Sequence, residues 1–376
     1  MSSLKFKNSL DILVIHALPP KSIRRSAVEE VDLIFPRNAS NHNYTIHNCS
    51  NPLPNYIKEM NFDAIILGAT FLWQRANTDD FIKYLHEYDF IRKSNAFKIA
   101  MPQDDDFCNK ILDDWMCGWG IDLVYTVIPK NWGILYPRYI KTKGKIMLGY
   151  TGYISEEMIN MWKNPKSHNE RSIDVSYRSH RNHANYGQLG FIKGYIGDLF
   201  KTKFSDKNLV LDISTNPSDM IPGDNWYEFL GNSKFCITVN SSNNLLDPYG
   251  DIKRAVDEYQ WKYPQADYKE IEQKCYPGID GKYDFTAISP RVVEAALAET
   301  VQLAVPGNYS GILKPMEHYI PLMIDSSNVD EVYAIMNDKI MINRIAKNCK
   351  KAILNHSGLR AKEHVETAIN IIKSRW

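Results

Sequence analysis

The chain has 376 residues, of which 44% are hydrophobic and 24% charged, and its formal net charge at pH 7 is +1. This near-neutral balance lacks the basic footprint of a nucleic-acid-binding protein, so we expect no nucleic-acid partner. The length predicts two domains of similar size. The N-terminus shows no signal-peptide pattern, and the longest apolar run, residues 64–73, is about half of the roughly 20 residues that a membrane span needs. We therefore expect a cytoplasmic protein, with peripheral contact to the inner membrane face as a further option.

Short apolar runs alternate with helical patterns through the first part of the chain. The runs are apolar on both faces, as expected of parallel strands covered by helices, and they occupy residues 11–17, 63–69, 97–101 and 122–128. Helical patterns follow them, most clearly at residues 77–94 and 108–119. This alternation predicts an α/β fold with right-handed crossovers, and it places a first Rossmann-like domain at residues 1–160.

The alternation stops at a polar segment, residues 155–171, where we place the domain boundary. It then restarts, with strands predicted at 172–178, 209–214, 234–240 and 301–306, and helices at 186–202, 225–233 and 289–300. A polar and aromatic insert at 243–282 interrupts this second domain, which we assign to residues 171–355. A final helix, within residues 356–376, is expected to pack near the junction of the two domains.

Three consecutive aspartates follow the predicted strand at 97–101, and three interpretations of them stay open. Asp106 precedes a helical pattern and could be its N-cap, with Asp104 and Asp105 favoured by the positive helix end. Alternatively, Asp105 or Asp104 serves as a general base, as could His16 at the end of the first predicted strand. A metal site is the third interpretation, but it would need further ligands from elsewhere in the chain.

No motif in the sequence supplies such metal ligands. The six cysteines are scattered, with no CxxC and no Cys/His cluster at zinc spacing, which predicts reduced and mostly buried thiols. His180 and His183 have HxxH spacing, and we interpret them as loop residues rather than ligands.

The loop after the predicted strand at 172–178 favours anion binding. Arg178 ends that strand, and Gly187 and Gly190 open the following helix. A glycine-bearing loop that leads into a helix N-terminus presents backbone N–H groups to an anion. Arg178 and Lys193 could add positive charge there.

The segment 289–313 gives the sharpest local pattern. Ser289 and Pro290 predict an N-cap and a first helical turn, after which Arg291 and Glu294 share one face of the helix. The next predicted strand ends in a glycine-bearing loop with Gly307, Asn308, Tyr309 and Ser310. A carboxylate at a helix start can bind ribose hydroxyls while loop N–H groups meet phosphates. The alternative is a surface Arg–Glu pair of little energetic consequence.

These residues carry a family resemblance. The segment PRVVEAALAETVQLAVPG resembles the donor-domain signature of GT-B glycosyltransferases. A longer set, IDVSYR…LGFIK, SSNNLLDPYGD, ISPRVVEA and GNYSGILKPMEHYIPL, is similar to bacterial surface-polysaccharide glycosyltransferases of the spore-maturation-protein (CgeB-like) type. The resemblance implies two Rossmann-like domains facing across a cleft, with the C-terminal helix crossing back to the first. It also implies a nucleotide-sugar site that includes Arg178, Lys193, Arg291, Glu294, Gly307, Asn308, Tyr309, Ser310 and His318, with Glu294 on the ribose.

The implied activity is sugar transfer from a nucleotide-sugar donor to a glycan or lipid-linked acceptor in bacterial surface polysaccharide (O-antigen, capsule or lipopolysaccharide) synthesis, with no metal or other cofactor. Thr286 occupies the position where many retaining relatives carry a second glutamate, which favours inversion with Asp105 or His16 as the base. A nucleotide-sugar epimerase and a non-catalytic binding protein on the same fold are the alternatives. The donor base and sugar, the linkage, the oligomeric state and the roles of Asp247 and the insert stay open.

Overall fold

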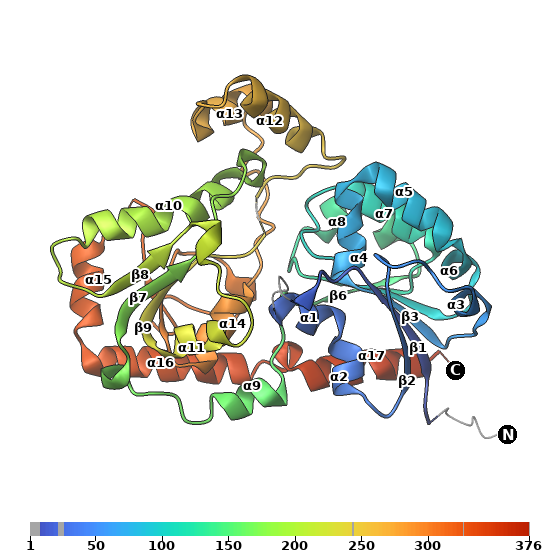
Figure 1. Ribbon diagram of the computed structural model, residues 1–376, viewed down its shortest axis with the longest axis horizontal. Coiled ribbons are helices and arrows are strands. Elements are labelled where there is room, and N and C mark those ends of the chain that lie inside the picture. The colour runs from blue at the N-terminus through green and yellow to red at the C-terminus, as the bar shows by residue number, and fades with distance from the viewer. Residues whose placement is uncertain (1–7, 22–25, 243, 326, 376) are drawn as a thin grey trace. The chain divides into compact units, whose positions relative to one another are not determined.

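The computed structural model describes residues 8–21, 26–242, 244–325 and 327–375. The chain divides into two compact units (Figure 1). Unit 1 comprises Met1–Tyr153, Asp247–Gly250 and Ser357–Trp376, and unit 2 comprises Ile154–Leu246 and Asp251–His356. The segment 155–171, where we placed the boundary, thus lies inside unit 2, and the C-terminal segment belongs to unit 1 almost entirely.

Unit 1 is built on a six-stranded parallel sheet with the order β2-β1-β3-β4-β5-β6. Its strands are β1 (Asp11–His16), β2 (Asn43–Asn48), β3 (Ala64–Leu67), β4 (Phe97–Ala100), β5 (Leu123–Thr126) and β6 (Lys145–Leu148). The four runs that the sequence predicted are the four central strands, which are almost wholly buried. The two edge strands, β2 and β6, were not predicted, because half-exposed strands lack the continuous apolar run.

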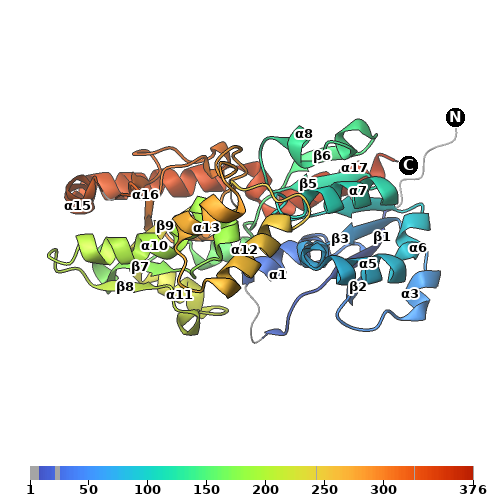
Figure 2. The same cartoon turned by 90° about the horizontal axis from the view of Figure 1, so that it is seen from above.

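Helices lie on both faces of this sheet (Figure 2). They are α1 (Ser26–Asp32), α2 (Ile34–Asn38), α3 (Asn55–Glu59), α4 (Ala69–Trp73), α5 (Thr78–Glu87), α6 (Asp89–Lys93), α7 (Asn109–Trp119), α8 (Trp132–Leu135) and the C-terminal α17 (Ala361–Lys373). Helix α17 packs on unit 1 through an apolar stripe that includes Val365, Ala368 and Ile372. Within the same stripe His364 lies 4.3 Å from the ring of Tyr125, measured between ring centroids.

Unit 2 is built on a five-stranded parallel sheet with the order β11-β10-β9-β7-β8. Its strands are β7 (Ile173–Arg178), β8 (Leu211–Ser214), β9 (Ser233–Thr238), β10 (Val301–Ala304) and the short β11 (Ile320–Pro321). Successive residues of β9 point to opposite faces, as the pleat requires. Phe235 and Ile237 join the large apolar core, while Cys236 packs with Leu230 and Ala295.

The helices of unit 2 cover both faces of its sheet (Figure 1, Figure 2). They are α9 (Glu156–Met161), α10 (Gly187–Lys203), α11 (Asn225–Gly231), α12 (Asp251–Lys262), α13 (Tyr268–Cys275), α14 (Pro290–Leu297), α15 (Val329–Met336) and α16 (Lys339–Leu354). The polar insert is thus helical: α12 and α13 share a small core of their own, formed by Ala184, Leu245, Val256, Ile271 and Tyr276. No helix among the described residues combines the length and the apolar character that a membrane crossing requires.

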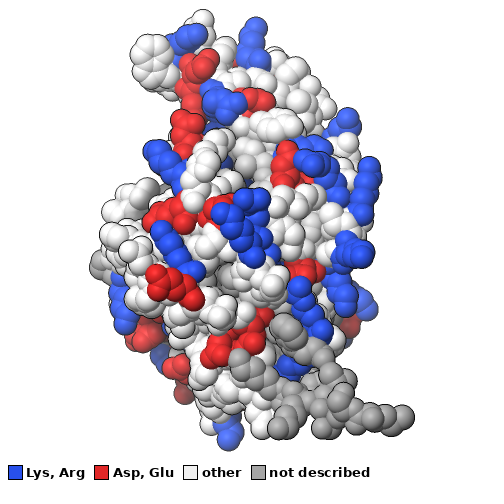
Figure 3. Space-filling view, turned by 90° about the vertical axis from the view of Figure 1, so that its right-hand side faces the viewer, with Lys and Arg blue, Asp and Glu red and all other residues white. Residues whose placement is uncertain are grey.

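Two further properties agree with the composition of the chain: the state of the cysteines and the distribution of surface charge. All six cysteines are free, and Cys49, Cys108, Cys236 and Cys349 are buried, as the scattered spacing predicted. On the face shown in Figure 3, Lys and Arg side chains are interspersed with Asp and Glu side chains, in keeping with the net charge of +1.

Candidate functional site

Both sheets reverse their strand order at one place. Unit 1 reverses between β1 and β3, and unit 2 between β7 and β9. In open α/β sheets, ligands bind beyond the carboxyl ends of the strands at this point, where the two neighbouring loops diverge. In unit 2 this edge carries Arg178 at the end of β7 and Asn240 just after β9. The residues that the sequence singled out in the second domain fall around it.

Glu294 is held at this edge by a residue that the sequence did not single out. Trp226, on α11, donates its indole N–H to Oε2 of Glu294 over 2.7 Å. Glu294 is only 5% exposed, and burial raises the pKa of its carboxyl, although Trp226 and Arg291 act in the opposite direction. Its other oxygen, Oε1, makes no hydrogen bond among the described residues. The carboxylate therefore has one oxygen fixed and one available as an acceptor.

Arg291 does not pair with Glu294, although the two lie one turn apart on α14. Its guanidinium instead donates to the carbonyl of Arg178, at the end of β7. The same group lies 5.2 Å from the ring centroid of Tyr177 and 5.4 Å from that of Trp226. These cation–π contacts and the hydrogen bond fasten the start of α14 to the end of β7. A half-buried positive charge thus lies beside the Glu294 carboxylate.

The loop after β10 has a constrained backbone. Tyr309, Ser310 and Gly311 all have positive φ, at 45°, 53° and 75°. A left-handed conformation costs a non-glycine residue roughly 1–3 kcal/mol, and such strain gathers at functional sites. The loop is held by Asn240, whose Oδ1 accepts from the backbone N–H of Tyr309 (3.1 Å), and by Ser310, whose Oγ accepts from that of Ile288 (3.0 Å).

Gly307 is required for this arrangement. A Cβ at position 307 would collide with the Asn240 amide nitrogen. Pro306 and Gly307 are exposed and Asn308 is half-buried, whereas Tyr309 is fully buried and donates its hydroxyl to the carbonyl of Val305 (2.6 Å). The tyrosine side chain therefore shapes the loop from inside, and Gly307 faces solvent.

Three of the remaining sequence-predicted residues have structural partners. Arg178 uses four N–H groups within the protein, with the Asp219, Tyr177 and Asp212 carbonyls and the Asp212 carboxylate as acceptors. Lys193 places its Nζ 3.4 Å from the Ser242 carbonyl. His318 is buried, its Nδ1 accepts from the backbone N–H of Lys314, and burial lowers its pKa. Arg178 and His318 thus stabilise the fold around the site.

The start of α10 is occupied by the protein's own carboxylate. Oδ2 of Asp280 accepts from the backbone N–H of Gln188 (2.5 Å) and from the hydroxyl of Tyr268 (2.6 Å). Gly187 has φ +64°, and a Cβ there would lie 2.7 Å from the Asp280 carboxylate. The Asp280 carboxylate therefore occupies the helix N-terminus at which we expected an anion to bind.

In unit 1 the aspartate loop surrounds a buried arginine. Arg75 is fully buried and donates to four backbone carbonyls, those of Leu72, Gln103, Asp104 and Phe107. Four charge-assisted hydrogen bonds fix the loop's path. Asp104, with φ 49°, is the one aspartate of the three that is partly exposed.

Asp105 is fully buried and points away from solvent. Its Oδ2 accepts from the hydroxyls of Thr126 and Tyr136, while Oδ1 has no hydrogen-bond partner among the described residues. Burial raises its pKa to about 6. Asp105 therefore cannot touch an acceptor unless the loop rearranges.

The predicted N-cap role of Asp106 is wrong. Helix α7 begins at Asn109, and its N-cap is Cys108. Residues 106–108 instead pair with Asp247, which donates to the Asp106 carbonyl (3.0 Å) and accepts from the Cys108 N–H (2.8 Å). The segment Asp247–Gly250, within unit 1, thus anchors the aspartate loop through its backbone.

His16 ends β1 and is 8% exposed. Its Nδ1 accepts the backbone N–H of Leu18 over 3.1 Å. The neutral ring therefore carries its proton on Nε2, which disfavours Nε2 as a proton acceptor.

Among the residues that the structure describes, no group of three or more His, Cys, Asp or Glu side chains converges as metal ligands would.

Comparison with known proteins places this geometry in a fold. No family model and no curated protein matches the sequence. Among solved structures, an α-glucosyltransferase in complex with UDP and a 13-mer DNA containing an HMU base aligns with a TM-score of 0.57 at 10% identity, over 97% of this chain and 100% of that one. A DNA-modifying β-glucosyltransferase, solved with and without uridine diphosphoglucose, gives 0.50 at 14% identity, over 97% and 99%. TarM gives 0.52 at 9% identity, over 85% of this chain and 57% of its own.

These similarities concern the fold, because the identities are low. They agree with the two parallel sheets of six and five strands and with the expectation drawn from the sequence. The chain therefore has the α/β fold of GT-B glycosyltransferases.

Proposed function

We propose that this protein is a glycosyltransferase that moves a sugar from a nucleotide-sugar donor to an acceptor hydroxyl. The observation that carries the proposal is Glu294, a nearly buried carboxylate oriented by Trp226 at the carboxyl edge of the second sheet. Burying a carboxylate costs free energy unless it gains partners. A ribose diol supplies two hydroxyl donors for such a group. Of the solved structures with the same fold, one is a complex with UDP and another was solved with and without uridine diphosphoglucose, which supports a nucleotide donor.

The other residues of this edge suit the rest of the donor. Arg291 supplies positive charge beside Glu294, and the exposed backbone of Gly307 can approach a diphosphate closely. Fixed positive groups and backbone N–H groups stabilise the charge that develops on the leaving diphosphate. We propose that these groups do so without a bound metal, with Lys193 as an additional cation after a change of rotamer.

For the acceptor, we propose Asp104 as the base and Asp105 as the residue that positions the loop. The acceptor oxygen attacks the anomeric carbon, its proton passes to the Asp104 carboxylate, and the bond from that carbon to the diphosphate oxygen breaks. The nucleoside diphosphate leaves with the bonding electrons. Direct attack inverts the anomeric centre, in keeping with the missing second glutamate at Thr286.

A glycan or a lipid-linked sugar of a bacterial surface polysaccharide is the acceptor class that we propose, at the cytoplasmic face of the inner membrane. This setting rests on the sequence resemblance. The two glucosyltransferases with this fold include one solved with DNA, so the acceptor panel must include DNA with hydroxymethylated bases.

The test is release of the nucleotide from donor sugars, followed with and without acceptors. UDP-, GDP- and dTDP-sugars would release the nucleoside diphosphate, and CMP-sugars would release CMP. Acceptor-dependent release that is lost in Glu294→Ala supports the proposal. Epimerised donor with no nucleotide release identifies the epimerase alternative. Nucleotide binding without any turnover identifies a non-catalytic binding protein.

A further inference from the structure

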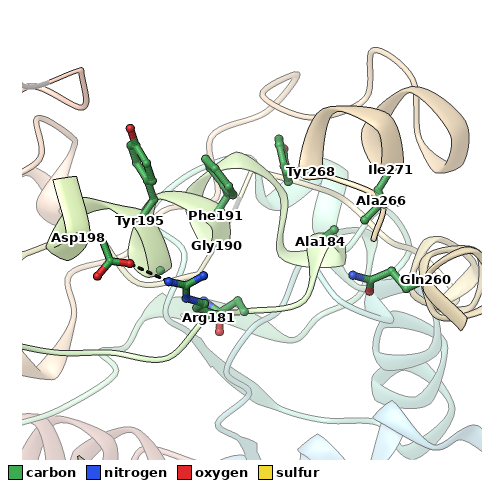
Figure 4. A pocket seen from close by; sticks show the side chains of 12 residues that line it. Arg181, Ala184, Gly190, Phe191, Tyr195, Asp198, Gln260, Ala266, Tyr268 and Ile271 are labelled. Atoms are coloured by element: carbon green, nitrogen blue, oxygen red, sulfur yellow. Dashed lines mark hydrogen bonds and ion pairs between the residues drawn. The ribbon is translucent and has the colours of Figure 1, made fainter. Parts of the chain in front are cut away.

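A pocket lies in unit 2, between α10 and the helical insert (Figure 4). Its volume is about 230 Å³, and its walls come from the loop before α10, the first three turns of α10, the end of α12 and the start of α13. It shares no residue with the Glu294 site. Drug-sized ligands occupy pockets of roughly 300 Å³ or more, so this volume suits a smaller ligand or one unit of a longer one.

Three aromatic rings form a row along this pocket (Figure 4). Phe191 and Tyr195, one turn apart on α10, stack at 5.5 Å with an interplanar angle of 13°. Tyr268, from α13, stacks on Phe191 at 5.0 Å and 26°. Phe191 is 45% exposed and Tyr195 is 42% exposed, which is unusual for rings of this size on a helix that packs against a sheet.

The three aromatic side chains are preorganised, because hydrogen bonds within the protein hold the elements that carry them. The Tyr268 hydroxyl donates to Asp280, and the same carboxylate accepts from the first turn of α10, so helix and insert are held together. Gly194 lets the preceding loop lie against α10, because a Cβ there would lie 3.1 Å from Cγ of Arg181. A rigid aromatic surface loses little conformational entropy on binding.

The polar groups of the pocket are electrically balanced. Arg181 donates to Asp198 over 2.7 Å on one side, and Asn182 and Gln260 contribute amides that both donate and accept. The insert from 251 to 282 carries six Lys and Arg residues against seven Asp and Glu residues. A nucleic-acid strand would need a basic groove beside the aromatic rings. A neutral ligand with apolar faces and many hydroxyls fits both features.

We propose that this pocket binds one pyranose ring of a glycan acceptor, packed against the exposed edges of Phe191 and Tyr195, with hydroxyls bonded to a polar side chain of the pocket such as Arg181. The proposal rests on the proposed glycosyl transfer. A pyranose has C–H faces that pack on aromatic rings and a rim of hydroxyls that donate and accept. The pocket would hold the growing chain while the donor occupies the separate Glu294 site.

The test uses the full chain and saturation-transfer NMR with methyl glycosides of glucose, galactose and N-acetylglucosamine, and with oligothymidylate as the competing probe. We expect one glycoside to bind and Phe191→Ala to weaken it about tenfold, with Phe191→Leu nearly as weak because it keeps apolar bulk without the ring. Trp261→Ala is the matched control. Trp261 is 83% exposed on the same insert but does not line the pocket, so its loss should leave glycoside affinity unchanged.

Absence of glycoside binding, equal binding by Phe191→Ala, or binding of oligothymidylate at these rings would each overturn the inference. Nucleoside diphosphates titrated into the same samples keep it separable from the proposed function. Nucleotide binding without glycoside binding would refute the sugar-binding role of the pocket and would leave the proposed transferase function standing. Glycoside binding without nucleotide binding or turnover would confirm a sugar-binding pocket. It would refute the transferase function and, with it, the acceptor role of the pocket. With an active enzyme, Phe191→Ala should raise the KM for the acceptor and leave the KM for the donor unchanged.

Discussion

The indole nitrogen of Trp226 and Oε2 of Glu294 lie 2.7 Å apart, and this hydrogen bond joins α11 to α14 at the carboxyl edge of the second sheet. The two residues are 68 positions apart in sequence. Their contact turns a carboxylate that would otherwise be free to rotate into an oriented acceptor. The proposed donor site depends on this orientation.

Removing the Glu294 carboxylate should weaken nucleotide binding. Glu294→Ala is expected to lower affinity roughly ten- to a hundredfold, because hydrogen bonds to a charged group contribute about 1.5–3 kcal/mol. Trp226→Phe should cost about threefold to tenfold, since the carboxylate stays but loses its orientation. Isothermal titration with the preferred nucleoside diphosphate measures both.

A matched control for these variants lies on α11 itself. Glu228 is exposed and lies two residues after Trp226, about half a helical turn away, and Glu228→Ala should leave nucleotide affinity unchanged. If Glu294→Ala binds nucleotide as tightly as Glu228→Ala does, the ribose role of Glu294 is wrong.

The loop after β10 should not tolerate a side chain at Gly307. Gly307→Ala forces its Cβ into the Asn240 amide, which also holds Tyr309, so the loop must move. We expect a destabilisation of about 1–3 kcal/mol and a clear loss of donor affinity. Gly118→Ala is the control: nothing lies within 4 Å of its Cβ, and alanine in a helix should stabilise by roughly 0.5–1 kcal/mol. Donor affinity unchanged in Gly307→Ala would separate this loop from the donor site.

Asp105 should make unit 1 less stable as pH rises from about 4 to about 6. Its pKa is raised by burial from 3.8 to about 6, so in this range the folded protein keeps a proton that the unfolded chain has lost. Stability then falls with rising pH, by up to about 3 kcal/mol for this group. Asp105→Asn removes the effect, so its stability relative to wild type should increase between pH 4 and pH 7 in urea unfolding.

A second variant sharpens that test. Thr126→Val removes a hydroxyl that donates to the ionised carboxylate of Asp105, so the pKa of Asp105 should rise further and the pH dependence should extend upward. A stability difference between Asp105→Asn and wild type that does not change with pH would show that the carboxyl ionises normally in the folded protein.

His364 should have the opposite pH dependence. Burial lowers the pKa of His364 from 6.5 to about 3. Below pH 6.5 the imidazole is therefore protonated in the unfolded chain but stays neutral in the folded protein. Stability therefore falls as pH falls, by up to about 5 kcal/mol. His364→Phe should be less acid-sensitive than wild type. Val365→Ala, which removes packing on the same helix, should lower stability equally at pH 5 and pH 7.

The central strands could be predicted because each is buried on both faces and therefore apolar throughout. The edge strand β2, with the sequence NYTIHN, carries no such signal and forms because β1 offers a parallel partner over six residues. A solvated helical insert was one of the interpretations open for residues 243–282, but the bounds of α12 and α13 could not be predicted because their charged sequences carry no long apolar run. Their folding depends on a small apolar core that includes Ala184, outside the insert.

Residue types at the site could be predicted, but their partners could not. Arg178 and Glu294 were singled out together, yet they differ in what they leave available to a ligand. The hydrogen-bond acceptors of Arg178 lie on β7, on β8 and in the loop after β8, whereas Glu294 keeps one available carboxylate oxygen. The expected cap at Asp106 failed because Asp247, distant in sequence, pairs with that backbone. Such partnerships follow from tertiary packing, which leaves no local pattern.

The most direct test of the central claim is thermal unfolding of wild type and Glu294→Ala with UDP, GDP, dTDP, CMP and ADP, in EDTA and then in Mg²⁺. A nucleotide at about 100 times its Kd should stabilise the folded state by roughly 2.7 kcal/mol. We predict that one nucleotide stabilises wild type in EDTA and that Glu294→Ala loses most of this stabilisation. No stabilisation of wild type by any nucleotide, or an equal shift in Glu294→Ala, would contradict the assignment of the second sheet's edge as a donor site.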